Sequence, residues 1–509
     1  MAKKESNQIL ELVSKYELCN DKNRPYIIDG NRALLIGGKD SKDFLSFLFF
    51  EEIGRTPSDT AMKEALQTLR GLAQFRSDER QIYNRVAAVD GKCYLDLCDK
   101  KNTIIVTDSK GSRIAKNPPV IFARTEGMKP LPLPEFPGTL EKLKSFFNIK
   151  SDTDFQLLIS WMESCLRGRP KNRGSFAMLN IGGPAGAAKS TTAKIITFLI
   201  DPASPEVRTT PKEVRDLFIA ASKRYIISFD NISALDREMQ DCCCSIATGG
   251  GFARKENYTD MDETIFENCN PLIFNGIEFS RRPDFADRCI DIELDEIKPE
   301  HRLTEEELWE KVEAARPEIL GGLLTLLSNS LREFEKGIKT DSLPRLADFA
   351  KFTIAVERAA GWTHGSTLRA LNENQQAAKS EISEGTPAIK NIAQYISEHK
   401  TFTGTASELF ELIKTDAKDF PKNPRALSSI IQRNIGVLNA LGITVEKSRT
   451  TTGRIFSIMT QDANDAKIPT SLFREKEGNN KIEAAQNLRH CDICDNSNIP
   501  DWDELSPVN

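Results

Sequence analysis

The chain has 509 residues, of which 39% are hydrophobic and 28% are charged, and its formal net charge at pH 7 is -5. This length predicts about three domains. No apolar run reaches the ~18 residues that a membrane span requires, and the charged first residues lack the apolar core of an export signal. We therefore expect a cytoplasmic protein with no membrane partner. The net charge excludes a global basic field for nucleic acid but leaves room for local basic patches.

Two residue types limit the chemistry further. The four histidines are spread along the chain, which argues against a histidine-based catalytic metal site. Of the 11 cysteines, Cys242, Cys243 and Cys244 are adjacent, which is more typical of a reducing compartment than of a disulfide framework. We expect these three side chains to pack as small apolar groups in a helix.

An N-terminal α+β module is predicted over residues 1–137. A helix is expected near 59–74, and short alternating runs then indicate a β-meander over 81–89, 92–97, 103–107 and 120–124. Proline-rich residues 129–137 end the regular structure.

The rest of the chain is predicted to divide into four segments. Short apolar runs alternate with helical segments up to about residue 300, as in a parallel α/β sheet. The segments are an α/β core at 138–300, a helical lid at 301–384, a third module at 385–460 and a flexible acidic tail at 461–509.

A glycine-rich loop separates an apolar run from a helical segment. The run over 176–181 is predicted to be a buried strand, and residues 193–200 have helical periodicity. Strand, loop and helix in this order are the context that a Walker A phosphate loop requires. The residues predicted to bind nucleotide are Gly183, Pro184, Ala185, Gly186, Ala187, Ala188, Lys189, Ser190 and Thr191.

The residue types in this loop have physical roles. Gly183 and Gly186 allow the backbone to turn its N–H groups toward phosphates, and the following helix N-terminus adds partial positive charge. Lys189 reaches the β- and γ-phosphates of ATP, and Ser190 offers its hydroxyl to Mg²⁺. ATP and Mg²⁺ are therefore the predicted cofactors.

Ala188 stands where the Walker A pattern has glycine before the lysine. Alanine tolerates a positive φ poorly, but we expect this residue to lie close to helical geometry, where one methyl group does not block binding. The alternatives are a chance glycine–alanine turn and a loop that binds nucleotide without hydrolysing it.

A carboxylate ends the apolar run over residues 224–230. Asp230, at a strand end beside the phosphate loop, can hold Mg²⁺ in the Walker B role; an ordinary strand-end aspartate is the alternative. The next residue, Asn231, can position water but cannot accept a proton. The general base is therefore open, with Asp236 and Asp241 as possible substitutes.

A third apolar run, over residues 271–275, ends in Asn275. Its amide could contact the γ-phosphate or the attacking water, and a turn-forming asparagine is the alternative. Arg281, Arg282 and Arg288 follow. We favour Arg288, directly before another strand-like run, as an arginine finger for the ATP of a neighbouring subunit; a surface salt bridge is the alternative.

Together these motifs resemble the superfamily 3-type helicase domains, of the AAA+ class, in phage and plasmid primase-helicases. The shared order is Walker A at 183–190, Walker B at 226–230, a glycine-rich segment at 247–255 and then Asn275. The chain is also similar to a prokaryotic and prophage ATP-binding family in the stretches 230–231, 247–251, 274–277 and 343–349. The resemblance covers about residues 85–460 and is strongest in the ATPase core.

The resemblance implies a fold, an assembly and partners. The fold would be a P-loop AAA+/superfamily 3-like α/β core, in which Asn275 is the sensor 1 residue and Ala188 and Asn231 are usual at their positions. The chain would form a ring, expected to be hexameric, with ATP between subunits. DNA, single-stranded or forked, would be the substrate, and a separate protein could supply a primase.

In the same superfamily, the segment after Walker B precedes a β-hairpin that reaches DNA. Gly249, Gly250 and Gly251 permit a sharp backbone turn there, and Arg254 and Lys255 could meet phosphates. The expected hairpin tip at 259–263 is acidic, so a hairpin packed at a subunit interface is the alternative. Arg345, in the helical lid, is a weaker candidate for a γ-phosphate ligand.

The third module is predicted to be a winged helix. Helices are expected over 387–398, 405–414 and 424–441, followed by a hairpin over 444–458, which is the order of winged-helix DNA readers. Between 421 and 459 there are six basic residues and one acidic residue, a net charge of +5 that suits phosphate contact. The candidate DNA residues are Arg425, Arg433, Arg449 and Arg454; a solvated face of a protein-interaction domain is the alternative.

The predicted function is an ATP-dependent DNA translocase or helicase in phage-like or mobile-element replication. The main alternative, kept open by Asn231, is an ATP-binding scaffold or DNA-binding adaptor with slow turnover. A protein-remodelling ATPase in defence is a second. A single Cys-x-x-Cys pair at Cys491 and Cys494 lacks the two further ligands that a zinc site needs.

Overall fold

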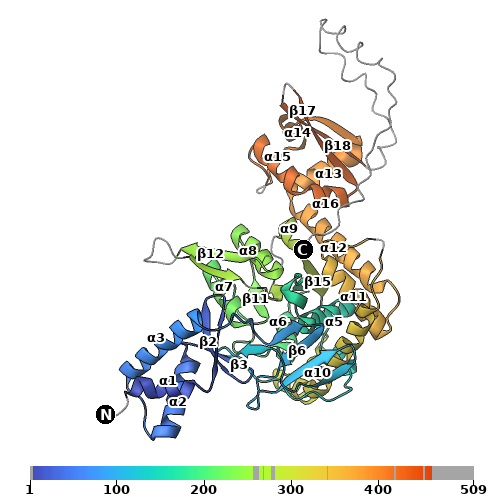
Figure 1. Cartoon of the computed structure of the whole chain (residues 1–509). Coiled ribbons are helices and arrows are strands. Elements are labelled where there is room, and N and C mark those ends of the chain that lie inside the picture. The colour runs from blue at the N-terminus through green and yellow to red at the C-terminus, as the bar shows by residue number, and fades with distance from the viewer. Residues whose placement is uncertain are drawn as a thin grey trace, which may run out of the picture.

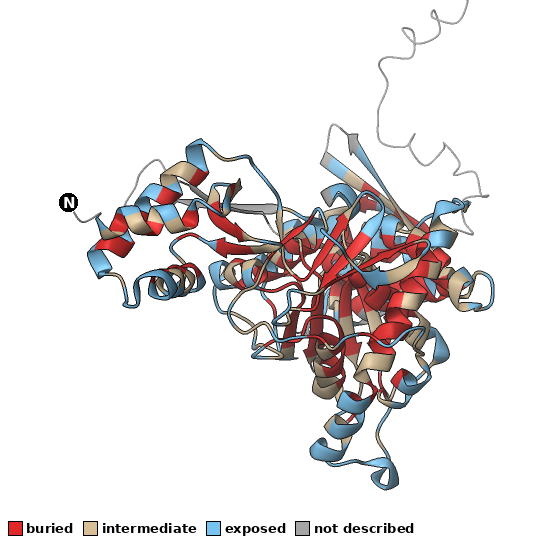
Figure 2. Ribbon diagram, turned by 60° about the horizontal axis from the view of Figure 1, so that its bottom comes forward, coloured by how far each residue is buried: buried red, intermediate tan, exposed pale blue. Residues whose placement is uncertain are grey.

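The computed structural model describes residues 4–255, 263–267, 269–276, 281–340, 342–417, 420–450 and 453–460. Figure 1 shows an N-terminal part, a central α/β core and a C-terminal part that stands on the core. Buried residues gather on the elements at the centre of the core (Figure 2). No described helix is long and apolar enough to cross a membrane.

The N-terminal part contains three helices and a five-stranded sheet of order β1-β2-β3-β9-β4. The predicted helix at 59–74 is α3, which begins after Ser58, whose hydroxyl accepts a hydrogen bond from the Ala61 N–H. No individual helix or strand before α3 was predicted from the sequence. The elements are α1 (Glu5–Val13), β1 (Glu17–Asp21), β2 (Arg24–Asp29), β3 (Arg32–Leu35), α2 (Lys39–Ile53), α3 (Asp59–Phe75), β4 (Ile82–Tyr83) and β9 (Ile121–Ala123).

A second sheet, of order β5-β6-β7-β8, is the antiparallel meander. Its strands are β5 (Val86–Val89), β6 (Lys92–Asp96), β7 (Ile104–Asp108) and β8 (Gly111–Ile114). The predicted meander was partly wrong: the run at 81–89 is two strands in different sheets, and the run at 120–124, β9, returns to the first sheet. The run breaks because Arg85 has φ 58° and turns the chain.

The central core contains a parallel sheet of order β11-β14-β10-β15, which confirms the predicted α/β alternation. A separate antiparallel hairpin, β12 (Gly251–Lys255) with β13 (Glu263–Glu267), leaves the core between α8 and β14. The other elements are α4 (Glu141–Ser145), α5 (Asp152–Arg167), β10 (Met178–Gly182), α6 (Lys189–Ile200), α7 (Val214–Lys223), β11 (Ile227–Ile232), α8 (Arg237–Thr248), β14 (Leu272–Gly276), α9 (Pro283–Ala286) and β15 (Cys289–Glu293).

Three helices, α10 (Glu305–Glu335), α11 (Ala347–Ala360) and α12 (Ser366–Gly385), cover the core. A capping box between Thr304 and Glu307 begins α10. The proline-rich link lies against this helix so closely that a Cβ on Gly321 would stand 1.7 Å from the Glu135 carbonyl oxygen. The link is therefore packed against the core.

The C-terminal part follows the predicted order of helices and hairpin, with two differences. The expected helix at 424–441 is two helices, because the chain turns at Asn434, whose Nδ2 donates to the Ile430 carbonyl. A strand, β16, that was not predicted completes the antiparallel sheet β16-β18-β17. The elements are α13 (Pro387–His399), β16 (Thr401–Thr405), α14 (Ala406–Ile413), α15 (Pro424–Arg433), α16 (Ile435–Ala440), β17 (Ile443–Thr450) and β18 (Gly453–Thr460).

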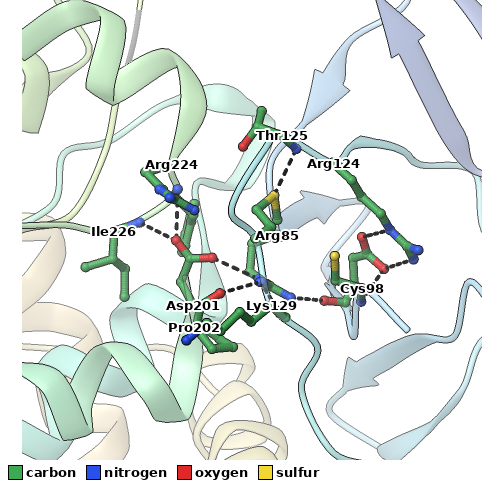
Figure 3. Close-up of polar contacts among 12 residues, drawn as sticks. Arg85, Cys98, Arg124, Thr125, Lys129, Asp201, Pro202, Arg224 and Ile226 are labelled. Atoms are coloured by element: carbon green, nitrogen blue, oxygen red, sulfur yellow. Dashed lines mark hydrogen bonds and ion pairs between the residues drawn. The ribbon is translucent and has the colours of Figure 1, made fainter. Parts of the chain in front are cut away.

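A fully buried ion pair joins the meander to the core (Figure 3). The Nε of Arg85 donates to Asp201 Oδ1 over 2.9 Å, and both side chains are 0% exposed. The other Asp201 oxygen accepts the N–H groups of Tyr225 and Ile226, each over 3.0 Å. Asp201 directly follows α6, and Ile226 directly precedes β11. One carboxylate therefore fixes the end of that helix to the start of that strand.

Replacing Arg85 with methionine should leave the Asp201 carboxylate buried without its cation. Breaking a buried pair in this way costs about 3–5 kcal/mol. We expect the free energy of unfolding of the core to fall by that order, measured by urea denaturation and the fluorescence of the core tryptophans.

The matched control is Arg80→Met. Arg80 pairs with Glu17 over 2.7 Å, but the two side chains are 44% and 53% exposed. An exposed pair contributes about 0–1 kcal/mol. Equal losses in the two variants would contradict the role assigned to Arg85.

Candidate functional site

The candidate site lies at the carboxyl edge of the parallel sheet, where ligands bind in open α/β folds. Residues 183–188 connect β10 to α6 as a tight loop. Gly183 has φ 134°, and a Cβ there would stand 2.7 Å from the Leu294 carbonyl oxygen. Gly186 has φ 81°. The loop therefore needs glycine at both positions, as the sequence predicted.

The expectation for Ala188 was wrong. Its φ of 64° and ψ of 33° lie in the left-handed region instead of near helical geometry. Closing the loop onto the start of α6 overrides the preference of alanine, which resists this conformation by about 1–2 kcal/mol. This strain lies one residue before the predicted phosphate-binding lysine.

The loop, the helix and the second strand meet at Ser190 and Asp230. The Ser190 hydroxyl donates to Asp230 Oδ1 over 2.6 Å. The Lys189 ammonium donates to the carbonyls of Gly183 over 2.6 Å and Pro184 over 2.9 Å, so it lies folded over the loop. The fold therefore brings together the side chains of Lys189, Ser190 and Asp230, which are up to 41 residues apart in the sequence.

The donor set suits a magnesium ion bound together with phosphates. Mg²⁺ takes oxygen ligands and is commonly held by one or two carboxylates plus phosphate oxygens and water. Ser190 and Asp230 offer such oxygens. Within the described ranges, no group of three or more His, Cys, Asp or Glu side chains could hold a metal without further ligands.

Asn275 links the ends of two strands. Its Oδ1 accepts the N–H of Asn231 over 3.0 Å, and Asn231 has a left-handed φ of 54°. Asn275 is only 1% exposed, and its Nδ2 has no hydrogen-bond partner among the residues that the structure describes. A buried unpaired donor costs about 1–3 kcal/mol, so this amide fits a site that receives an acceptor.

The two aspartates considered as substitute bases have structural partners. Asp236 accepts the Met239 N–H and caps α8. Asp241 forms ion pairs with Arg237 and Arg282.

The candidate arginines do not all lie at the same end of the parallel strands. Arg281 pairs with Asp291 in β15. Arg288 pairs with Asp284 over 2.6 Å just before β15 begins. Because the parallel register sets Cys289 beside Met178, the first residue of β10, Arg288 lies at the edge opposite the loop. It therefore faces away from the loop of its own chain.

Arg345 also lies at that opposite edge, where it pairs with Asp284 and with Asp287 over 3.1 Å. The suggestion that it contacts the γ-phosphate in its own chain does not fit this position.

The hairpin begins after the left-handed Gly249, where a Cβ would stand 2.7 Å from the Arg169 guanidinium. In the hairpin, Arg254 is paired in register with Thr264, and Lys255 with Glu263. The side chains of Arg254 and Lys255, and residues 256–262, lie outside the described part. DNA contact by these residues stays a prediction.

Three of the arginines predicted to contact DNA are exposed in the C-terminal part. Arg425 and Arg433 lie on α15 and Arg454 on β18, and all three are exposed. None of them forms an ion pair with a described residue. The side chain of Arg449, and the pair Cys491 and Cys494, lie outside the described part.

A cleft of about 940 Å³ continues from the loop toward β15 and α12. Sequence reasoning missed most of its polar lining, because the acids there belong to no motif. The charged and amide side chains that line it are Asp154, Asn180, Lys189, Arg281, Asp291, Glu293, Glu373 and Asn374. A separate cleft, of about 1020 Å³, lies between the first sheet and the amino edge of the core.

Two family models match the chain. Residues 140–376 match the actinomycete integrative conjugative element replication protein, RepA, and residues 388–471 match the RepA C-terminal domain of these elements. The chain is therefore similar to a replication protein of a conjugative element. No curated protein matches it.

Solved structures give only distant likenesses. The C-terminal region of NrS-1 in an apo form is 14% identical, with 90% of this chain and 100% of that chain covered and a TM-score of 0.38. JCV helicase with a bound substituted acetamide is 12% identical, with 41% of this chain and 66% of that chain covered and a TM-score of 0.22. These scores are too low to support an argument about function.

The left-handed Ala188 gives a test of the loop geometry. Ala188→Gly should raise the free energy of unfolding by up to about 1 kcal/mol, because glycine adopts this conformation without strain. Gly186→Ala should lower it by about 1 kcal/mol. No described atom lies within 4 Å of the added Cβ in Gly186→Ala, so a steric clash does not contribute to the loss. Urea denaturation that gave the opposite signs would contradict this loop conformation.

Proposed function

We propose that this chain, which matches a replication-protein family of conjugative elements over residues 140–376 and 388–471, is an ATP-dependent DNA translocase or helicase of the superfamily 3 type. The observation that carries the proposal is the contact of Ser190 with Asp230 beside Lys189. It joins a glycine loop, a helix N-terminus and a strand-end carboxylate in the arrangement that phosphoryl-transfer enzymes use.

The residues of the loop would bind and neutralise the triphosphate. The N–H groups of the loop and the N-terminus of α6 would bind the phosphates, and Lys189 would move from the loop carbonyls to the β- and γ-phosphates. Ser190 and Asp230 would hold Mg²⁺, which supplies charge neutralisation of the transferred phosphoryl group. The free Nδ2 of Asn275 would donate to the γ-phosphate or to the attacking water.

The catalytic assembly would need a second subunit. Arg288 lies at the sheet edge opposite the loop, where it can serve only the ATP of a neighbour. A closed ring, hexameric by resemblance, would supply this arginine to each site. Hydrolysis would then drive movement along single-stranded or forked DNA, with a primase from a separate protein.

The C-terminal part would bind DNA as a winged helix. It has four helices, α13 to α16, a short strand after the first of them and a terminal hairpin, and α15 would serve as the recognition helix. Arg425 and Arg433 on this helix and Arg449 and Arg454 on the hairpin would contact phosphates. Arg254 and Lys255 of the core hairpin would add contacts in the ring channel.

Asn231 supports a second candidate function. A second acid at this position would deprotonate the attacking water, whereas asparagine can position water but cannot accept its proton. Asp236 and Asp241 already have other partners. A chain that binds ATP but turns it over slowly would act as a nucleotide-gated DNA adaptor.

The two candidates differ in turnover. The motor predicts ATP hydrolysis that rises when DNA is added and that is lost in Lys189→Ala, because no ammonium then neutralises the phosphates. Steady-state ATPase rates with and without forked DNA measure this. Nucleotide binding with no turnover under any condition would contradict the motor and support the adaptor.

A variant of α15 that lacks one positive charge tests the proposed DNA binding of the C-terminal part. Arg433→Ala should weaken the binding of DNA of any sequence. The slope of log affinity against log salt concentration should also fall in magnitude by about one, because one phosphate contact is lost. Glu411→Ala, an exposed change on the neighbouring helix α14, is the matched control and should not weaken it. An unchanged salt dependence in Arg433→Ala would remove the C-terminal part from the DNA interface.

A further inference from the structure

The cleft beside the phosphate loop lies on the side where the nucleoside part of a bound nucleotide belongs. Asp230 lies in the second half of β11 and Asn275 is the last residue but one of β14, and both strands lie on one side of β10 in the sheet order. The cleft lies on the other side of β10, over β15. A triphosphate with its terminal group near Asp230 and its chain along the loop therefore points its ribose and base into this cleft.

The floor of the cleft is a polar patch on one face of the sheet. Asn180 and Asp291 are register partners, and Asn180 Nδ2 donates to the Asp291 carboxylate over 2.8 Å. Their apolar neighbours Leu179, Ile290 and Ile292 point to the opposite face and join the main core. The sheet thus keeps polar groups on this face next to the loop.

Helix α12 forms the wall of the cleft, and one side chain fixes it there. The Asn374 amide makes two hydrogen bonds to the backbone of Asp291, accepting from its N–H over 2.9 Å and donating to its carbonyl over 2.6 Å. Ala370, Glu373 and Ala377 lie four, one and three residues from this anchor and also line the cleft. Asn374 is thus fixed on Asp291, two residues before Glu293 on β15, and the neighbouring Glu373 lines the same cleft as Glu293.

The charges in the cleft disfavour phosphate and favour hydrogen-bond donors. Four carboxylates line it, against two cations, Lys189 and Arg281. Lys189 belongs to the phosphate loop, and Arg281 is paired with Asp291. A neutral group that carries hydroxyl or amine hydrogens suits this surface, as a ribose suits the acidic residue of other nucleotide folds.

Glu373 is the carboxylate best placed to receive such a donor. It is exposed, and it forms no hydrogen bond or ion pair with any described residue. By contrast, Asp291 is paired with Arg281, and Asp154 accepts the N–H of Glu293 over 3.4 Å.

We propose that the cleft under α12 is a nucleoside subsite in which Glu373 accepts a hydrogen bond from a ribose hydroxyl, so that the protein selects ribonucleoside triphosphates over 2′-deoxy ones. The proposal rests on the proposed function, because it needs the triphosphate in the adjacent loop. A DNA-replication protein would gain from it, since the deoxynucleotide pool would not occupy its site.

The test measures the binding of ATP, dATP and inorganic tripolyphosphate to the full chain by calorimetry with Mg²⁺. One hydrogen bond to a charged acceptor corresponds to roughly 10- to 100-fold in affinity. We expect the wild-type chain to prefer ATP over dATP by that order and Glu373→Gln to lose most of the preference. Glu310→Gln, an exposed change on α10, is the matched control and should keep the preference in full.

The possible results separate the two proposals. Equal binding of ATP and dATP, or a preference that Glu373→Gln leaves intact, would overturn the ribose contact while the phosphate site stands. Tripolyphosphate binding as tight as ATP would also overturn the nucleoside subsite. If none of the three ligands bound, the proposed function itself would fail. Unchanged tripolyphosphate binding by Glu373→Gln would show that the phosphate loop of the variant keeps its conformation.

Discussion

Helix α6 and strand β11 are tied together by polar contacts at both ends, and the candidate site depends on this. At the far ends, Asp201 joins the last turn of the helix to the N–H groups that precede the strand, with Arg85 as its buried cation. At the near ends, Ser190 meets Asp230. The far contact sets how the helix lies along the strand. It therefore sets whether the hydroxyl and the carboxylate at the other end can meet.

Because Arg85 comes from the turn before the meander, the sheet β5–β8 is part of this arrangement. Arg85 also donates to the carbonyls of Asp96, Lys129 and Pro202, so its guanidinium satisfies backbone groups of three segments (Figure 3). Apolar side chains of the same sheet, among them Val86 and Leu95, belong to the main core cluster. Packing and charge thus bind residues outside the central sheet to the geometry of the site.

Helix α12 connects the cleft to the C-terminal part. Its Asn374 is fixed on β15 beside the loop. One to two turns later, Ala378 and Ile382 are buried in the apolar cluster of the C-terminal helices. A ligand that moves the first part of this helix would move the C-terminal part with it, so the proposed nucleotide and DNA surfaces share one rigid element.

The sequence was sufficient for the parts of the site that depend on local pattern. Glycines, a lysine, a serine and two strand-end polar residues could be assigned because each follows an apolar run or precedes a helix. It was insufficient where contacts between segments distant in the sequence determine the position or conformation of a residue. Arg85 has the sequence context of a surface residue in a meander, and only the packed fold shows it buried against Asp201. Ala188 takes a conformation that its own preference disfavours, because the loop must close. Glu373 and Asn374 lie on a polar helix with no motif, and their place in the cleft comes from the way α12 packs on β15.

The central claim is that Ser190 and Asp230 hold a magnesium ion for ATP in the loop. The most direct measurement is the ATP affinity of the full chain with and without Mg²⁺, in the wild type and in Asp230→Asn. The account predicts that Mg²⁺ strengthens binding in the wild type and that this gain is lost in the variant, while metal-free binding persists. A magnesium effect of the same size in both chains would contradict it.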